Sequence, residues 1–179
     1  MTMSDDSIDF GGSVTVREAD PARGCRRFAG RVALVTAAAR GIGFASALRL
    51  AGEGATVCIT DRDEGALSEA SRIARHAGFT LHTQAMNSSN ATDVAARIAS
   101  IHAQHGRVDI LVNNAGGSLH TPYRFMEEGD DDWRRVMDLN VLGAVWACRA
   151  VLPGMVACGQ GRIVNVGSKA GRFGSLIAG

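Results

Sequence analysis

The chain has 179 residues, of which 46% are hydrophobic, so it has the length of one domain and enough apolar side chain to bury a core. Its 19 lysine and arginine residues nearly balance its 18 aspartate and glutamate residues, and the net charge is +1. This balance argues against nucleic acid or a membrane surface as a partner and favours small molecules or other protein chains.

Residues 1–27 are predicted to form a flexible extension, because they are rich in Ser, Asp, Gly and Arg and follow neither a helical nor a strand period. Their acidic start lacks the pattern of a secretory signal. Arg26 and Arg27 faintly resemble a twin-arginine export signal, but the apolar stretch after them fits a strand better. No apolar run reaches the roughly 18 residues that span a bilayer. The four cysteines form no Cys-x-x-Cys pair, so we expect a cytoplasmic protein with reduced thiols.

From Arg31 onward, short apolar strands alternate with helices. Val32–Val35 is wholly apolar, as expected of a strand buried on both faces of a parallel sheet. Further strands are predicted at residues 55–60, 79–85, 108–112 and 162–166. Helices are predicted at residues 41–53, over a segment that ends at Gly78, after a cap at Asn90, and from Asp130 to at least Cys148. This alternation predicts an α/β fold, a doubly wound, Rossmann-type parallel sheet over residues 28–179.

The turn between the first strand and the first helix is the first candidate site. It contains Thr36, Arg40, Gly41, Ile42 and Gly43. Glycines let the backbone approach a pyrophosphate, and the helix N-terminus that follows offers free amides and a positive dipole end. Two glycines alone are also compatible with a tight turn that binds nothing, so the interpretation depends on the residues downstream.

Asp61 ends the second predicted strand, 18 residues after Gly43. A carboxylate at this place can accept both ribose hydroxyls of an adenosine, and its charge repels a 2′-phosphate. The pattern therefore predicts NAD as the cofactor. Arg40 and Arg62 flank the same region and can pair with a phosphate, which keeps NADP as a less favoured alternative. The alternative is that Asp61 binds no cofactor and is an acidic residue in solvent at the end of a strand.

Three further motifs follow in order. Asn113, Asn114, Ala115 and Gly116 come after the fourth strand, Asn140 lies on the long helix, and residues 161–168 form a strand that ends at Ser168. Together with the turn at residues 36–43, these motifs resemble the short-chain dehydrogenase/reductase family, from about residue 28 to the C-terminus. The resemblance implies an oxidoreductase that transfers a hydride between NAD(P) and an alcohol or carbonyl substrate.

The resemblance also implies a role for each motif. Residues 113–116 hold the central strand and line the adenosine side of the cofactor. Asn140 orders a proton-relay water, and Ser168 hydrogen-bonds the reacting carbonyl or hydroxyl of the substrate. Taken alone, Asn140 is better explained as a core asparagine with its hydrogen bonds satisfied, and a capping or turn serine is a reasonable explanation of Ser168. Asn87, with its neighbour Ser88, stands where the family usually has an aspartate that contacts adenine, and an amide there still accepts a hydrogen bond.

The sequence departs from the family pattern at two further places. Ala37 replaces the first glycine of the cofactor turn, which is tolerable if the backbone φ angle there is negative. The catalytic tyrosine and lysine of the Tyr-x-x-x-Lys motif are absent, since only 11 residues follow Ser168 and the single tyrosine, Tyr123, and single lysine, Lys169, lie in the wrong elements. We therefore expect a chain truncated after its fifth strand and inactive by itself.

Such a chain is expected to form a homo-oligomer or to pair with a missing C-terminal part. The alternative function is a non-catalytic dinucleotide-binding or interaction module. No metal is expected, because His102 and His105 are best explained as a solvated helix face. The loop at residues 117–126, with His120 and Tyr123, is expected to border the substrate pocket.

Overall fold

Five parallel strands form the central sheet of the computed structural model, which describes residues 8–9, 15–16, 25–119 and 124–168. The strands lie in the order β5-β4-β3-β6-β7, and each neighbouring pair is parallel. Their bounds are β3 Val32–Val35, β4 Thr56–Asp61, β5 Leu81–Ala85, β6 Ile110–Asn113 and β7 Arg162–Asn165. All five match predicted strands, with ends displaced by at most two residues. The prediction of a doubly wound α/β fold is therefore confirmed.

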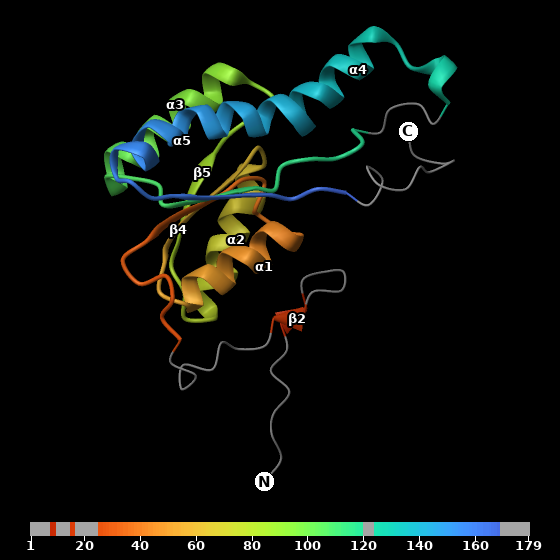
Figure 1. Ribbon diagram of the computed structural model, residues 1–179. Helices are drawn as coiled ribbons and strands as arrows, with labels where there is room; N and C mark the ends of the chain where they lie inside the picture. The colour runs from red at the N-terminus through yellow and green to blue at the C-terminus, as the bar shows by residue number, and fades with distance from the viewer. Residues whose placement is uncertain (1–7, 10–14, 17–24, 120–123, 169–179) are drawn as a thin grey trace.

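Helices cover both faces of this sheet, which makes a three-layered molecule (Figure 1). Helices α1 (Gly41–Gly52) and α2 (Glu64–His76) lie on one face, and α3 (Ala91–His105) and α5 (Gly143–Ala157) lie on the other. Because successive strand side chains point to opposite faces, Val57 and Ile59 of β4 enter the first core and Cys58 enters the second. Burial raises the pKa of the Cys58 thiol to about 12, which makes it an unreactive core residue.

The helix ends show why the chain turns where it does. The Asp63 side chain caps α2 by accepting a hydrogen bond from Ala66 N at 2.9 Å, and Asn90 caps α3 in the same way, as its sequence position predicted. Gly106, with φ +79°, ends α3 in the left-handed conformation that glycine adopts without strain. No side chain caps the N-terminus of α1, so its first amides remain open toward the strand ends.

The long helix predicted from Asp130 is continuous to Ala157, but it is not uniform. It consists of α4 (Asp130–Met137), a π-helical turn η3 (Asp138–Leu142) and α5, and a 3₁₀ turn η2 (Phe125–Glu127) precedes it. By length and composition alone this helix is apolar enough to cross a membrane, with a mean hydropathy of 1.5 over a window that is 22% buried. The buried residues of this long helix belong to α5, which packs against α3. Part of its apolar composition is therefore explained by packing in the protein core.

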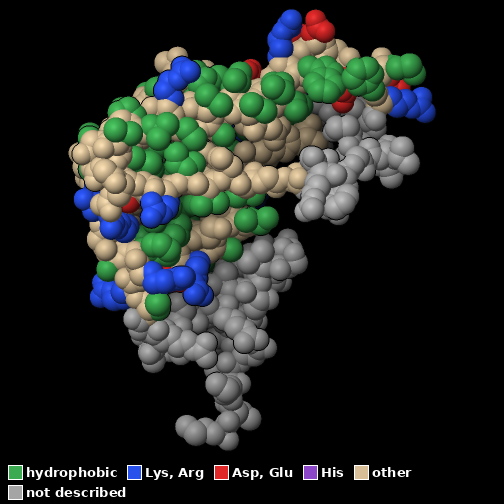
Figure 2. Space-filling view, in the orientation of Figure 1, with side chains coloured by type: hydrophobic (Ala, Val, Ile, Leu, Met, Phe, Trp, Pro, Cys, Tyr) green, Lys and Arg blue, Asp and Glu red, His purple; other side chains and the backbone are tan. Residues whose placement is uncertain are grey.

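Exposed apolar side chains remain on the opposite side of the long helix and at one sheet edge. The apolar helix surface, as we call it, comprises Trp133, Met137, Val141, Leu142, Val145, Leu152 and Val156. Hydrophobic side chains gather over this helix in the space-filling view (Figure 2). Within the described residues β7 pairs only with β6, so it forms one edge of the sheet, and Val164 on it is 50% exposed.

The N-terminal region contains structure that the sequence did not predict. Strands β1 (Ile8–Asp9) and β2 (Thr15–Val16) form a short antiparallel pair. Arg27, at the end of the predicted extension, donates to both carboxylate oxygens of Glu53, a residue that Arg49 also contacts. The hydrogen bond from Arg27 is the main cause that lowers the pKa of Glu53 from 4.5 to about 2, against the opposing effect of burial. The flexible extension over residues 1–27 stays a prediction.

Candidate functional site

A cavity of about 350 Å³ opens at the carboxyl ends of strands β3, β4, β5 and β6. It lies where the chain order reverses about β3, which is the place where open α/β sheets bind ligands. Its walls come from the segments that follow these strands and from the π-helical turn. The lining residues are Ala37, Asp61, Arg62, Met86, Asn87, Ser88, Ser89, Ala115, Gly116, Gly117, Ser118, Leu119 and Leu139.

Of the glycine turn only Ala37 lines the cavity, whereas the predicted cofactor residues Arg40, Gly41, Ile42 and Gly43 are not among the lining residues. The close packing of the turn depends on Gly43. A Cβ atom at this position would lie 2.6 Å from Nδ2 of Asn114 and 2.9 Å from the carbonyl oxygen of Ala37. The same Asn114 amide donates to the carbonyl oxygens of Thr36 at 3.1 Å and Ala37 at 2.9 Å. The turn is therefore fastened to the segment after β6, and the open N-terminus of α1 faces the strand ends beside it.

Thr36 and Asn114 lie behind the cavity rather than on its surface. Thr36 is buried, and its Oγ1 accepts hydrogen bonds from Asn114 N at 3.0 Å and Ala115 N at 3.1 Å. Asn113 is buried too, and its side-chain amide donates to Oδ1 of Asn165 at 2.8 Å, which joins β6 to β7. The structure gives these three predicted cofactor residues a supporting position, whereas Ala115 and Gly116 line the cavity.

Ala37 corrects one expectation from the sequence. An alanine here was expected to be tolerable if the local φ were negative, but φ is +49°. This is the left-handed region, where Cβ crowds the following carbonyl oxygen and a non-glycine residue is strained. The sequence could not reveal this angle, because the condition depends on how the turn is held by Asn114.

Asp61 lies on the rim of the cavity with its carboxylate fixed from two sides. Oδ2 accepts a hydrogen bond from Ala39 N at 3.2 Å, and Oδ1 accepts one from Asp63 N at 3.2 Å. Arg62 lines the cavity beside it. Arg40 does not turn to Asp61 but pairs with Asp63, with 2.7 Å between Nη2 and Oδ2. The carboxylate of Asp61 thus keeps acceptor capacity at the rim, since each of its oxygens has more than one lone pair.

Asn87 and Ser88 follow β5 and line the opposite part of the cavity. Asn87 N donates to Oδ2 of Asp93 at 2.7 Å, and Oδ1 of Asn87 accepts from Ser89 N at 3.0 Å. The hydrogen bond from Asn87 is the main cause that lowers the pKa of Asp93. These contacts fix the Asn87 side chain, and they leave the backbone of residues 87–89 as a wall of the cavity.

Asn140 lies in the π-helical turn and holds the loop after β6. Its Oδ1 accepts from Gly117 N at 2.9 Å, while its Nδ2 donates to the carbonyl oxygens of Gly117 and Val136, each at 2.9 Å. A Cβ atom on Gly116 would come within 2.9 Å of the Asn140 Oδ1 atom. A π-helical turn often marks a functional site, and here it aims one amide at the cavity wall.

Ser168 lies beyond the end of β7, at the same edge of the sheet as the cavity, and it is exposed. It is not among the residues that line the cavity. The predicted loop at residues 117–126 contributes Gly117, Ser118 and Leu119 to the lining, while His120 and Tyr123 lie outside the described residues, as does Lys169.

Sequence reasoning missed several lining residues, among them Met86, Ser89 and Leu139. Met86 and Ser89 follow the end of a parallel strand, and that position alone is a signal for proximity to a ligand. Leu139 carries no such signal, because its place at the cavity depends on the π-helical turn.

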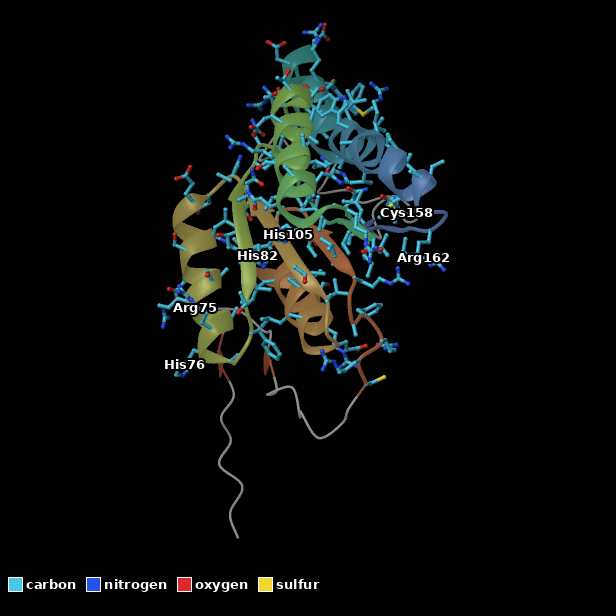
Figure 3. All side chains as sticks on the ribbon, turned by 90° about the vertical axis from the view of Figure 1, so that its left-hand side faces the viewer. Arg75, His76, His82, His105, Cys158 and Arg162 are labelled. Carbon is cyan, nitrogen blue, oxygen red and sulfur yellow. The ribbon has the colours of Figure 1, made fainter. Side chains whose placement is uncertain are left out.

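The histidines do not assemble a metal site in the part of the chain that is described, where no group of three potential ligands occurs. His105 of α3 lies against His82 of β5 rather than acting with His102, and their ring centroids are 4.6 Å apart (Figure 3). Burial, and then the charge of His105, lowers the pKa of His82. This contact is a packing interaction between α3 and the sheet edge.

Comparison with known protein families places these features in a wider context. The family model for short chain dehydrogenase matches residues 31–178. The chain is 38% identical over 146 residues to a 3-oxoacyl-[acyl-carrier-protein] reductase of Vibrio harveyi, which covers 82% of this chain and 58% of that relative. It is 35% identical over 149 residues to a 1,6-dihydroxycyclohexa-2,4-diene-1-carboxylate dehydrogenase of Acinetobacter baylyi, covering 82% of this chain and 56% of that one.

Solved structures agree with the sequence relatives. The NAD⁺-bound xylitol dehydrogenase superposes with a TM-score of 0.78 at 34% identity, over 85% of this chain and 58% of that chain. A metagenomic short-chain oxidoreductase in complex with NADP superposes with a TM-score of 0.77 at 35% identity, over 84% and 68% of the two chains. The chain thus spans 56–58% of the length of the two curated relatives described above.

Proposed function

The chain belongs to the short-chain dehydrogenase family, and we propose that its cavity holds the nicotinamide dinucleotide of an oxidoreductase acting on an alcohol or carbonyl substrate. The observation that carries this proposal is the position of the cavity at the carboxyl ends of the strands, with Ala37 of the turn before the uncapped helix α1 and Asp61 both in its lining. The α1 amides suit a pyrophosphate, and Gly43 lets the turn before them pack closely against Asn114. The nicotinamide supplies the hydride chemistry, and the chain binds and orients the cofactor.

NAD is the dinucleotide that the rim favours. The Asp61 carboxylate is fixed by two backbone amides and retains acceptor capacity for ribose hydroxyls. Its negative charge opposes a 2′-phosphate. NADP stays the second candidate because Arg40 and Arg62 lie beside it, and relatives with either dinucleotide occur among the solved structures.

Ser168 and Asn140 are the residues we assign to the reaction. Ser168 hydrogen-bonds the reacting oxygen of the substrate, and Asn140 orders the water that relays a proton. The Asn140 side chain is engaged with Gly117 and Val136, so in this arrangement it positions the cavity loop as well. The 179 residues contain no Tyr-x-x-x-Lys motif, the motif that by the family resemblance supplies the general acid and base. We expect the chain by itself to bind the cofactor without turning over a substrate.

The apolar helix surface is proposed as the contact with another polypeptide, either a second copy or the remainder of a longer protein. Val156 on it is 75% exposed, and six further large apolar side chains of the same helix are more than a third exposed. Contiguous apolar patches of this kind mark association sites on proteins. Residence in the cytoplasm is part of the same proposal and rests on the free thiols.

Equilibrium binding tests the proposed function. NADH fluorescence is titrated with the 179-residue chain and with the variants Asp61→Ala and Glu69→Gln. We expect saturable binding of NADH, weakened at least about tenfold by Asp61→Ala, because a charge-assisted hydrogen bond is worth about 1.5–3 kcal/mol. Glu69→Gln removes a charge from the exposed Arg72 pair on α2 and leaves binding unchanged. The alternative, an interaction module that does not bind dinucleotides, is supported if the unaltered chain shows no saturable binding.

A further inference from the structure

Four charged side chains lie on the two turns that follow β3 and β4, next to the part of the cavity wall where we propose that the adenosine ribose binds. Asp61 and Asp63 are the acidic pair, and Arg40 and Arg62 are the basic pair, so their formal charges sum to zero. Arg62 lines the cavity. Arg40 is 70% exposed at its side chain, yet it forms an ion pair with Asp63 rather than extending into solvent.

Asp63 is held in place by three separate contacts. Its Oδ1 accepts a hydrogen bond from Ala66 N at 2.9 Å, which caps α2, and its backbone N–H donates to Asp61 at 3.2 Å. Its Oδ2 atom receives the Arg40 guanidinium at 2.7 Å. Because the first two contacts fix Asp63 to the backbone, Arg40 is the partner that adjusts its position, and its long side chain is drawn toward α2.

This arrangement bears on which dinucleotide can bind. A 2′-phosphate brings about two negative charges to the rim, where Asp61 and Asp63 both repel it. Arginine is the side chain best suited to a phosphate, because its planar fork can donate two hydrogen bonds at once. Arg40 can give that interaction only by leaving Asp63, which then remains as an unpaired negative charge beside the phosphate.

We propose that Asp63 determines the preference for NAD by engaging Arg40 and by repelling the 2′-phosphate of NADP. This inference rests on the proposed function, since it concerns the same cavity. It adds to Asp61 a second specificity residue, one that is not among the residues lining the cavity. Asp63 acts through Arg40, so its effect depends on the presence of that arginine.

The test is the ratio of dissociation constants for NADP⁺ and NAD⁺, measured by titration calorimetry with the 179-residue chain. Asp63→Asn removes the charge and keeps a side-chain oxygen that caps α2, because Asn and Asp are equivalent N-caps. We expect the affinity for NADP⁺ to rise about three- to tenfold, because Arg40 is released from its surface ion pair and the repulsion between Asp63 and the 2′-phosphate is removed. The affinity for NAD⁺ changes less than about twofold. Asp63→Ser also keeps the cap and gives the same result if the charge is the cause.

Two further variants identify the cause. Glu69→Gln makes the same charge change on α2, the helix that Asp63 caps, in an exposed pair with Arg72, and leaves the ratio unchanged. In the double variant Asp63→Asn with Arg40→Gln, most of the gain in NADP⁺ affinity disappears. The inference is overturned if Asp63→Asn leaves the ratio of dissociation constants unchanged, or if the gain in NADP⁺ affinity persists fully in the double variant. In either case, binding of NAD⁺ by the unaltered chain still supports the proposed function. Failure of the unaltered chain to bind either dinucleotide overturns both.

Discussion

Replacing Ala37 with glycine is expected to stabilise the protein. Ala37 has φ +49°, a conformation that costs a residue with a Cβ atom about 1–2 kcal/mol relative to glycine. Replacing Ala37 with glycine removes this strain. Glycine loses more conformational entropy on folding than alanine, and this loss offsets about 0.5–1 kcal/mol of the gain. The side chain is half-buried at the cavity wall, so its removal leaves no enclosed void. The net expectation is a gain of about 0.5–1 kcal/mol, or about 1–4 °C in melting temperature for a chain of this length.

Urea denaturation followed by circular dichroism measures this change, with Ala39→Gly as the matched control. Ala39 lies two residues further along the same turn and is buried, and it is not among the residues with positive φ in the described part of the chain. Glycine in place of Ala39 relieves no strain. It raises the conformational entropy of the unfolded chain and removes a buried methyl group, and together these lower the free energy of unfolding by about 1 kcal/mol or more. If both variants lower the denaturation midpoint alike, the reasoning about strain at Ala37 is wrong.

Four further outcomes are expected. Gly43→Ala lowers the free energy of unfolding by about 1–3 kcal/mol in urea titrations, because its Cβ meets Asn114 at 2.6 Å, and a neutral result contradicts this packing. The pKa of Glu53 is lowered to about 2, so its stabilising contribution is present above pH 4.5 and is lost as the pH falls toward 2. Glu53→Gln should remove that part of the acid transition, whereas identical pH profiles would refute it. Val156→Asp lowers the apparent mass in light scattering if the apolar helix surface mediates association, and an unchanged mass speaks against it. The purified chain produces no NADH from a panel of alcohols, and measurable turnover contradicts the requirement for the missing tyrosine and lysine.

The sheet could be predicted because its information is local. A wholly apolar run such as Val32–Val35 is typical of a strand that is buried on both faces. The starts of α1 and α3 are marked in the sequence by the glycine turn and by the cap at Asn90. The Asp61 position likewise follows from the end of a strand. These features require no knowledge of which segments meet in space.

The features that were missed depend on contacts between distant segments. The π-helical turn at residues 138–142 interrupts a helix whose apolar pattern continues on both sides, and Asn140 in it is held by Gly117. The positive φ of Ala37 is set in a turn that Asn114 fastens from 77 positions away. The ion pair of Arg40 with Asp63 joins two separate turns in the same way. Residue type alone carries no signal for any of these three arrangements.

Chemical-shift mapping with the isotope-labelled chain tests most directly whether the cavity is the dinucleotide site. On addition of NAD⁺ we expect saturable shifts of the backbone amides that follow β3, β4, β5 and β6, centred on Gly43, Asp61 and Gly116. Amides near Arg72 on the exposed side of α2 should not move. Saturable shifts confined to other surfaces, or none at NAD⁺ concentrations that saturate ordinary dehydrogenases, would contradict the assignment of this cavity.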